Sequence, residues 1–143
     1  MKPVQILMVE DNLGDIELSR VALKRGKLVN ELNVVEDGEA ALDYLHQRGE
    51  YADAIRPDLV MLDLNLPKIS GRDVLKEIKG DDDLSSIPVI VLSSSEDASD
   101  IKESYSLNAN SFVTKPVKVE DFVDVVSSIE HFWIEIVKLP RTS

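Results

Sequence analysis

The chain has 143 residues, the length of one ordinary domain that can bury a single core. It contains no cysteine, which excludes disulfides, thiolate-bound metals and thiol chemistry. Asp and Glu total 27 against 16 Lys and Arg, a formal net charge of −11. This charge argues against DNA, RNA or an anionic membrane as the main partner and fits a binder of cations or of basic protein surfaces.

The N-terminal region shows no targeting signal. The first apolar run, from Val4 to Val9, is too short and wrongly flanked for a secretory signal peptide. No run in the sequence approaches the ~20 apolar residues of a membrane span. We therefore expect a cytoplasmic protein whose partners include neither a nucleic acid nor a membrane.

Short apolar runs alternate with amphipathic stretches along the chain. The apolar runs predict strands over Val4–Val9, Leu32–Val35, Leu59–Leu62, Pro88–Leu92 and Ser111–Thr114. Three of these runs are continuously apolar, which is typical of strands covered by helices on both faces. The helical patterns predict helices over Asp15–Arg25, Glu39–Gln47, Gly71–Lys79, Ala98–Leu107 and about Val119–Val137.

This alternation predicts the α/β class, with a parallel sheet, right-handed crossovers and helices on both faces. The five units indicate a flavodoxin-like doubly wound fold with five helices and the strand order 2-1-3-4-5. The sequence shows no repeat and no linker, so residues 1–143 are expected to form a single domain with an extended last helix. Two local details are also predicted. Ser70 caps the helix at Gly71, and Leu18, Val21 and Ala22 share one side of the first helix.

Polar residues follow the predicted strands at the edge where such folds bind ligands, beyond the carboxyl ends of strands 1 and 3. Glu10 and Asp11 follow strand 1 and Asp63 follows strand 3, so the three carboxylates are expected to converge. Two unit charges ~4 Å apart repel by about 4 kcal/mol at an effective dielectric of 20. A divalent cation relieves this repulsion, and hard oxygen ligands favour Mg²⁺ or Mn²⁺.

Two further side chains approach the same site from strands 4 and 5. The Ser93 hydroxyl and the Lys115 ammonium would hold oxygens of a phosphoryl group, while the metal neutralises its charge. Asp63 is central and is the expected nucleophile. Each residue alone is more often a helix cap or a turn, but their combination at successive strand ends is specific.

One glycine and four stretches carry a family resemblance: Ile6–Asn12, Pro57–Pro67, Gly71, Pro88–Ser93 and Phe112–Pro116. In this order they resemble the receiver domain of response regulators, the phosphoacceptor proteins of two-component signalling. The resemblance runs from Val4 to about Ser128. It implies a receiver core of about residues 4–128 and a C-terminal helical extension of about residues 129–143.

The resemblance implies a signalling protein and no enzyme with a separate substrate. Asp63 would accept a phosphoryl group from a histidine kinase in a Mg²⁺-dependent reaction, with self-catalysed uptake and slow autodephosphorylation. Mg²⁺ would be held by Asp11, by Asp63 and by the backbone carbonyl of Asn65, and Glu10 would help through water.

The remaining implied roles concern the response to phosphorylation. Lys115 would pair with the phosphoryl group, Ser93 would close onto it, and Phe112 would follow as the aromatic switch residue. The sequence departs from the commoner family pattern at two places. Glu10 stands where Asp is usual, and Ser93 stands where Thr is usual, which keeps the hydroxyl and loses a methyl group.

Two segments indicate a narrower resemblance, to stand-alone regulators paired with bacterial phytochrome-type histidine kinases. They are the lengthened connection Gln47–Arg56 and the C-terminal run Ile129–Pro140. Roughly 15 residues follow Ser128, too few for a DNA-binding module, so the expected output is protein contact, dimerisation or relay of the phosphoryl group onward.

The C-terminal run can also be interpreted without the family resemblance. Its large apolar residues spread around most of a helix: Phe132, Trp133, Ile134, Ile136 and Val137. Such surplus apolar surface either tucks under a loop or forms a partner surface, most often a homodimer. The expected homodimer would use the last helix and the face made by helix 4, strand 5 and helix 5.

Two other functions remain open at this point. A Mg²⁺-dependent phosphatase or phosphotransferase could use the same aspartyl nucleophile, but Asn65 occupies the position where a haloacid-dehalogenase-type enzyme needs an acid/base Asp. A scaffold without phosphorylation would be favoured by loss of Asp63, Asp11 or Lys115, and all three are present. The two histidines, His46 and His131, are expected to be ordinary surface or partly packed residues.

Overall fold

The computed structural model describes residues 3–25, 29–93, 101–102 and 111–114. The described strands are β1 (Val4–Val9), β2 (Asn30–Val35), β3 (Leu59–Asp63), β4 (Val89–Ser93) and β5 (Ser111–Thr114). The described helices are α1 (Leu13–Arg25), α2 (Gly38–Leu45) and α3 (Gly71–Gly80), with one 3₁₀ turn, η1 (Gly49–Tyr51). None of the helices in these ranges is long and apolar enough to cross a membrane.

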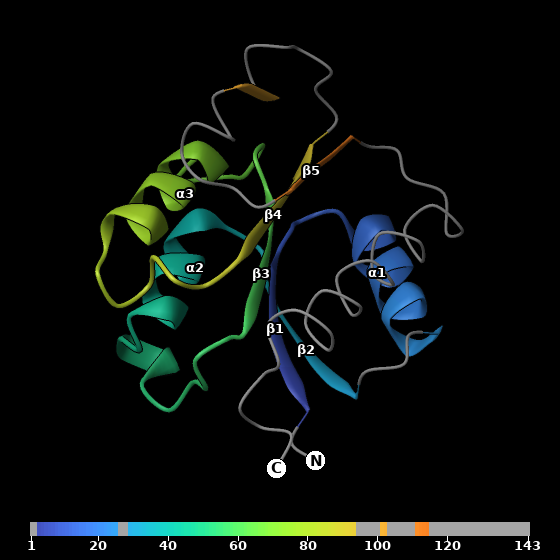
Figure 1. Ribbon diagram of the computed structural model, residues 1–143, viewed down its shortest axis with the longest axis horizontal. Coiled ribbons are helices and arrows are strands. Elements are labelled where there is room, and N and C mark those ends of the chain that lie inside the picture. Colours follow the sequence, from blue (N-terminus) through green and yellow to red (C-terminus); the bar gives the residue numbers. More distant parts are fainter. Residues whose placement is uncertain (1–2, 26–28, 94–100, 103–110, 115–143) are drawn as a thin grey trace.

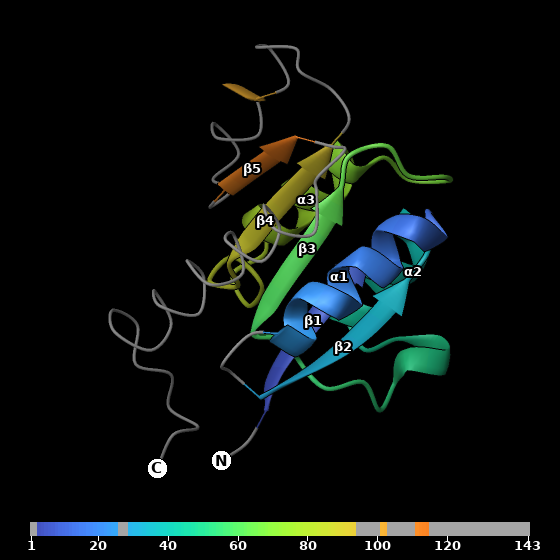
Figure 2. The ribbon, with the colours of Figure 1, turned by 90° about the vertical axis from the view of Figure 1, so that its right-hand side faces the viewer.

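The strands form one parallel sheet in the order β2-β1-β3-β4-β5. Helix α1 covers one face of the sheet, and α2 and α3 cover the other (Figure 1). The arrows of the sheet point the same way in Figure 2, so their carboxyl ends share one edge. The predicted parallel α/β architecture of flavodoxin-like type is confirmed. The helices predicted over Ala98–Leu107 and Val119–Val137 lie outside the described residues, apart from positions 101 and 102.

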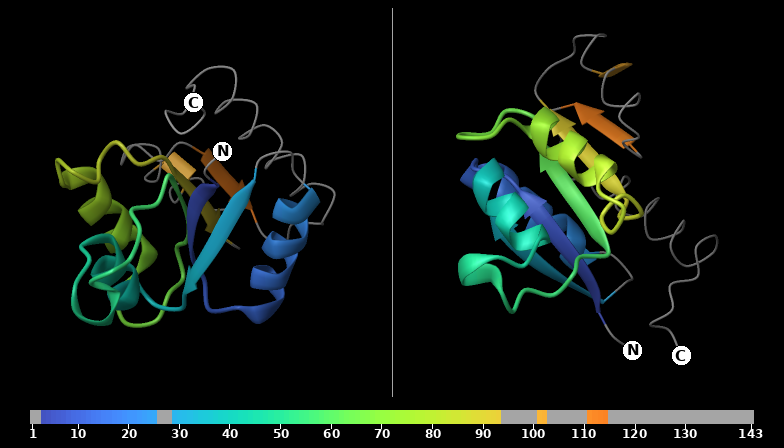
Figure 3. Two further views of the ribbon diagram at one scale, coloured as in Figure 1. Left: turned by 90° about the horizontal axis from the view of Figure 1, so that it is seen from below. Right: turned by 90° about the vertical axis from the view of Figure 1, so that its left-hand side faces the viewer.

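The central strands are buried on both faces. Every residue of β3 and β4 is buried, as the continuous apolar runs predicted. Alternate residues belong to two separate apolar clusters. Figure 3 shows α1 on one side of the sheet and α2 and α3 on the other. Val60 and Leu62 belong to the cluster under α2 and α3, whereas Leu59 and Met61 belong to the cluster under α1.

Helix α1 begins at Leu13, two residues earlier than predicted, because the Asn12 side chain accepts the N–H of Asp15 at 2.9 Å. Its buried residues include Ile16 and Ser19, and the buried Ser19 hydroxyl donates to the carbonyl of Asp15 at 2.9 Å. The prediction for Val21 is wrong, since this side chain is exposed. The buried face runs through positions 16, 19, 22 and 23 at helical spacing, which leaves position 21 pointing outward.

Helix α2 begins at an Asp37 cap, whose side chain accepts the N–H of Ala40 at 2.7 Å. It ends at Leu45, earlier than the predicted Gln47, because Gln47 adopts a φ of +55°, which a right-handed helix does not contain. The lengthened connection that follows folds back, and its Tyr51 ring packs on Tyr44 with centroids 5.5 Å apart. Burial raises the pKa of the Tyr44 hydroxyl.

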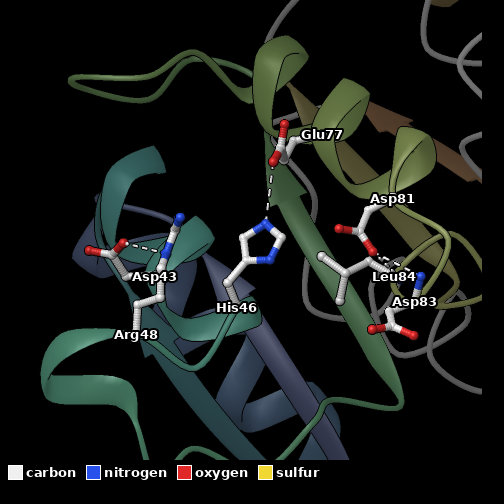
Figure 4. Close-up of polar contacts among 7 residues, drawn as sticks. All are labelled: Asp43, His46, Arg48, Glu77, Asp81, Asp83 and Leu84. Atoms are coloured by element: carbon white, nitrogen blue, oxygen red, sulfur yellow. Dashed lines mark hydrogen bonds and ion pairs between the residues drawn. The ribbon is translucent and has the colours of Figure 1, made fainter.

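Helix α3 packs beside α2, and one polar contact joins them. His46, the residue that caps the end of α2, places Nε2 3.3 Å from Oε1 of Glu77 on α3 (Figure 4). His46 is thus a partly packed residue, as predicted. At its other end α3 begins at the predicted Ser70 cap, whose hydroxyl accepts the N–H of Asp73 at 3.2 Å.

The turn that leads from α3 into β4 is closed by polar contacts. Asp81 Oδ1 accepts the N–H groups of Asp83 and Leu84, at 2.8 and 3.2 Å (Figure 4). The half-buried Lys79 ammonium donates to the carbonyls of Ser85 and Ile87, at 3.2 and 2.8 Å. Burial lowers the pKa of Lys79. The acidic run after α3 is therefore a turn.

Two glycines at opposite ends of α3 are predicted to respond oppositely to alanine. A Cβ on Gly71 would lie 2.2 Å from the Asp63 carbonyl oxygen, so Gly71→Ala forces the backbone apart and is expected to cost about 1–3 kcal/mol. A Cβ on Gly80 would meet nothing within 4 Å, so Gly80→Ala is expected to stabilise by about 0.4–1 kcal/mol. Urea unfolding of both variants measures the difference, and equal effects would contradict the close contact at Gly71.

Candidate functional site

Glu10 is a carboxylic residue held by backbone N–H groups at the carboxyl end of β1. It is fully buried, and its backbone N–H continues the sheet by donating to the carbonyl of Val35 at 3.0 Å. Its Oε2 accepts the N–H groups of Asp11 and Asn12, at 3.1 and 3.2 Å. These bonds offset part of the cost of burying a carboxyl group and fix its orientation.

Asp63 is the last residue of β3 and is 5% exposed. Its Oδ1 accepts the N–H of Asn65 at 3.0 Å, which ties the carboxylate to the loop that follows the strand. The backbone beside it stays in the sheet, because Leu64 donates to the carbonyl of Leu92 at 3.3 Å. Gly71 of α3 packs directly on this turn, and its N–H donates to the carbonyl of Leu64 at 3.0 Å.

The parallel pairing of β1 with β3 brings three carboxylic side chains together. One oxygen from each of Glu10, Asp11 and Asp63 lies within 4.8 Å of the others. Glu10 and Asp63 are buried, and Asp11 is exposed. At such a separation two unit charges repel by about 3 kcal/mol at an effective dielectric of 20, and solvent weakens this for Asp11. The three sets of hard oxygen donors fit a divalent cation of the Mg²⁺ or Mn²⁺ type.

Of the other predicted site residues, the structure describes some fully, one by its backbone only and one not at all. Ser93 is the last residue of β4 and is fully buried, one residue beyond the register partner of Asp63. Asn65 is exposed on the loop after β3. Phe112 belongs to β5, opposite Val91, but its side chain lies outside the described part. Lys115 follows the last residue of β5 and lies outside the described residues.

The sequence alone did not reveal the residues that support these carboxylates. Asn12 has two roles, since its N–H bonds Glu10 and its side chain caps α1. Gly71 was predicted to begin α3, but its contact with the Asp63 backbone depends on how α3 meets the strand. A polar residue two places after an acidic residue, directly before a helical pattern, is the signal that would have indicated Asn12.

These features define the class of protein. The model of the response regulator receiver domain family matches residues 6–127, most of the chain. The chain therefore belongs to the response regulator receiver family, as the motifs predicted.

Relatives with solved structures resemble the chain over nearly its whole length. The response regulator Rcp1 of Synechocystis sp. is 46% identical over 96% of this chain and 94% of that protein. A structure of Rcp1 in its Mn²⁺-bound form superposes with a TM-score of 0.86 at 46% identity, covering 96% of this chain and 99% of that one. The structure of the phosphorylated cyanobacterial phytochrome response regulator RcpA superposes with a TM-score of 0.87 at 47% identity, covering 97% of this chain and 99% of that one. The structure of the bacteriophytochrome response regulator AtBRR superposes with a TM-score of 0.77 at 43% identity, covering 93% of this chain and 96% of that one.

Removing one carboxylate is predicted to change both stability and the response to metal. In buffer with EDTA, Asp63→Asn is expected to raise the free energy of unfolding by about 1 kcal/mol, because repulsion within the cluster falls. Mg²⁺ at a hundred times its dissociation constant should stabilise the original chain by about 2.7 kcal/mol, and the variant much less. Thermal denaturation with and without Mg²⁺ measures both effects.

The matched control is Asp82→Asn, which removes an exposed carboxylate in the turn after α3. This variant should keep the full stabilisation by Mg²⁺. A cation-induced increase in melting temperature that persists in Asp63→Asn would show that the ion binds elsewhere.

Proposed function

We propose that this chain is a response regulator that accepts a phosphoryl group on Asp63 from a histidine kinase. The observation that carries the proposal is the convergence of Glu10, Asp11 and Asp63 within 4.8 Å at the carboxyl edge of the sheet. Membership of the receiver family supports it, as does the similarity to RcpA, a phytochrome response regulator whose structure is of the phosphorylated form.

The residues of the site would divide the reaction among them. The Asp63 carboxylate attacks phosphorus, so that an oxygen–phosphorus bond forms as the phosphorus–nitrogen bond of the kinase phosphohistidine breaks. The N–H of Asn65 holds the carboxylate in place through Oδ1. Glu10, Asp11 and Asp63, with the Asn65 carbonyl, would hold Mg²⁺, which neutralises negative charge on the phosphoryl group when bound. The Mn²⁺-bound form of Rcp1 supports this divalent site.

Three residues would translate phosphorylation into a change of shape. Ser93 is the last residue of β4, next to the strand that carries Asp63, and its hydroxyl would donate to the phosphoryl group. Lys115 would pair with another phosphoryl oxygen, and Phe112 would follow Ser93 as the switch residue. The order of these residues along the strands supports these three roles.

The partner kinase would be of the phytochrome type. RcpA is a phytochrome response regulator and AtBRR a bacteriophytochrome response regulator, and each resembles this chain over more than nine-tenths of its length. The lengthened connection before β3 and the apolar C-terminal run support the same assignment. The chain would act in the cytoplasm, as expected from the sequence. It would be a signalling protein that does not turn over a separate substrate.

Acetyl phosphate with Mg²⁺ is predicted to add one phosphoryl group to the chain, because the small donor supplies the same transferable group as a phosphohistidine. Intact-mass spectrometry should show the gain in the original chain and none in Asp63→Asn or after chelation with EDTA. Asp82→Asn is the control and should be phosphorylated normally. A gain that survives Asp63→Asn would sink the assignment of the phosphoacceptor. Steady turnover of small phosphate esters would favour the phosphatase alternative.

The proposed output is a homodimer formed by the C-terminal helix and the face of helix 4, strand 5 and helix 5. The helices concerned lie outside the described residues, and support comes from the apolar residues of the run Ile129–Pro140. We also propose that residues 1–143 form one domain, with a receiver core of about 4–128 and a helical extension of about 129–143. The family match over residues 6–127 is compatible with this division.

Sedimentation velocity is predicted to separate the chain from a truncation that ends at Ser128. The full chain should sediment as a dimer at micromolar concentration and the truncation as a monomer, because the extension supplies the apolar contact surface. Both samples should retain Mg²⁺-dependent phosphorylation, which checks that the truncation is folded. Two monomeric samples, with and without acetyl phosphate, would contradict the dimer.

A further inference from the structure

Lys68, which has no role in the proposed site so far, connects the loop between β3 and α3 to the beginning of α2. We propose that Lys68 is a positioning residue for the carboxylate site. Through ion pairs with Asp37 and Glu39 it holds the loop after β3 on the N-terminus of α2, and thereby helps to fix Asp63. The inference rests on the proposed function, since it concerns the Mg²⁺ site formed by Asp63.

One partner in the Lys68 ion pairs, Asp37, is already held in place by its role as the cap of α2. Lys68 Nζ lies 3.6 Å from Asp37 Oδ2 and 4.0 Å from Glu39 Oε2. Asp37 uses its other oxygen to cap α2, and its side chain is only 22% exposed. Because the cap immobilises Asp37, the pair loses less side-chain entropy than a contact between two freely moving groups.

The backbone on both sides of Lys68 is also held against α2. The N–H of Gly38 donates to the carbonyl of Pro67 at 3.4 Å. A Cβ on Gly38 would lie 2.2 Å from the Ile69 carbonyl oxygen, so the two backbones have no room between them. Lys68 itself has a φ of +66°, a conformation that persists in a non-glycine residue only where its surroundings impose it.

Packing alone does not restrain the lysine side chain. A cavity of about 280 Å³ borders the tip of the loop and is lined by Lys68, Asp37, Glu39 and Tyr51 among others. A side chain that borders open space lacks neighbours on that side, so the two carboxylates supply the restraint there.

The loop is short, and it is tied to the site at its other end. Asn65 bonds Asp63 Oδ1 at 3.0 Å, and Gly71 donates to the carbonyl of Leu64 at 3.0 Å. The segment from Leu64 to Ser70 is thus held at three places: by Asp63, by the start of α3 and by the start of α2. Without the Lys68 ion pairs, only the backbone contacts of Gly38 hold the tip on α2, so the loop and the Asp63 carboxylate are held less firmly.

The direction of the effect on Mg²⁺ distinguishes positioning from simple electrostatics. Lys68 is a cation on the loop that leads from the anionic site, so through-space electrostatics alone predict tighter Mg²⁺ binding when its charge is removed. Loss of positioning predicts weaker binding. Because Lys68 is 60% exposed, the expected weakening is modest, about two- to fivefold in the dissociation constant.

The experiment is a calorimetric titration of the full chain with MgCl₂ at constant ionic strength. Lys68→Met should raise the dissociation constant about two- to fivefold, and Lys68→Arg, which keeps the charge, should stay within about twofold of the original. Lys76→Met removes a lysine charge from the exposed side of α3 and is the matched control, with an unchanged or lower constant. The melting temperature of Lys68→Met in EDTA should stay within about 4 °C of the original.

Phosphorylation by acetyl phosphate gives a second readout. The Mg²⁺ concentration for half-maximal rate should rise in Lys68→Met by the same factor as the dissociation constant, while the rate at saturating Mg²⁺ stays within about twofold. An unchanged or lower dissociation constant in Lys68→Met would overturn the inference and leave the proposed function intact. An original chain that binds no Mg²⁺ would overturn both.

Discussion

The structure depends on one electrostatic constraint, which is the gathering of three carboxylic side chains at the edge where β1 and β3 end. Burial on both faces of the sheet leaves the strand interiors no room for polar chemistry, so the functional groups are confined to the strand ends. Parallel pairing then brings Glu10, Asp11 and Asp63 within 4.8 Å. Such a cluster is unfavourable by itself, and a bound divalent cation would relieve this repulsion.

The backbone around the cluster compensates for this cost. Glu10 accepts the N–H groups of Asp11 and Asn12, and Asp63 accepts the N–H of Asn65. The loop after β3 is in turn fixed by backbone contacts at Gly71 and Gly38, where a side chain would collide with main-chain atoms. These backbone contacts fix the orientation of the carboxylates, which would lower the reorganisation that binding of a cation requires.

The sequence predicted most of this arrangement because the relevant signals are local. Continuous apolar runs identified the buried strands, the Ser70 cap marked the start of α3, and the acidic residues at successive strand ends indicated the site. Features that depend on how elements meet were not predictable. The face of α1 that excludes Val21 is set by packing on the sheet, and the early end of α2 depends on the left-handed backbone at Gln47. The docking of Lys68 on Asp37 joins two loops distant in sequence, and no local pattern encodes it.

The sheet also divides the apolar interior of the described residues into two clusters that share no side chain. One includes side chains of α2 and α3, and the other includes side chains of α1. Substitutions in separate, non-contacting clusters combine almost additively. The two halves of the core can therefore diverge at different rates, one adapting the surface around α1 to a new partner while the other preserves the packing that supports the loop after β3. A single domain of this kind has two interiors on which selection can act separately.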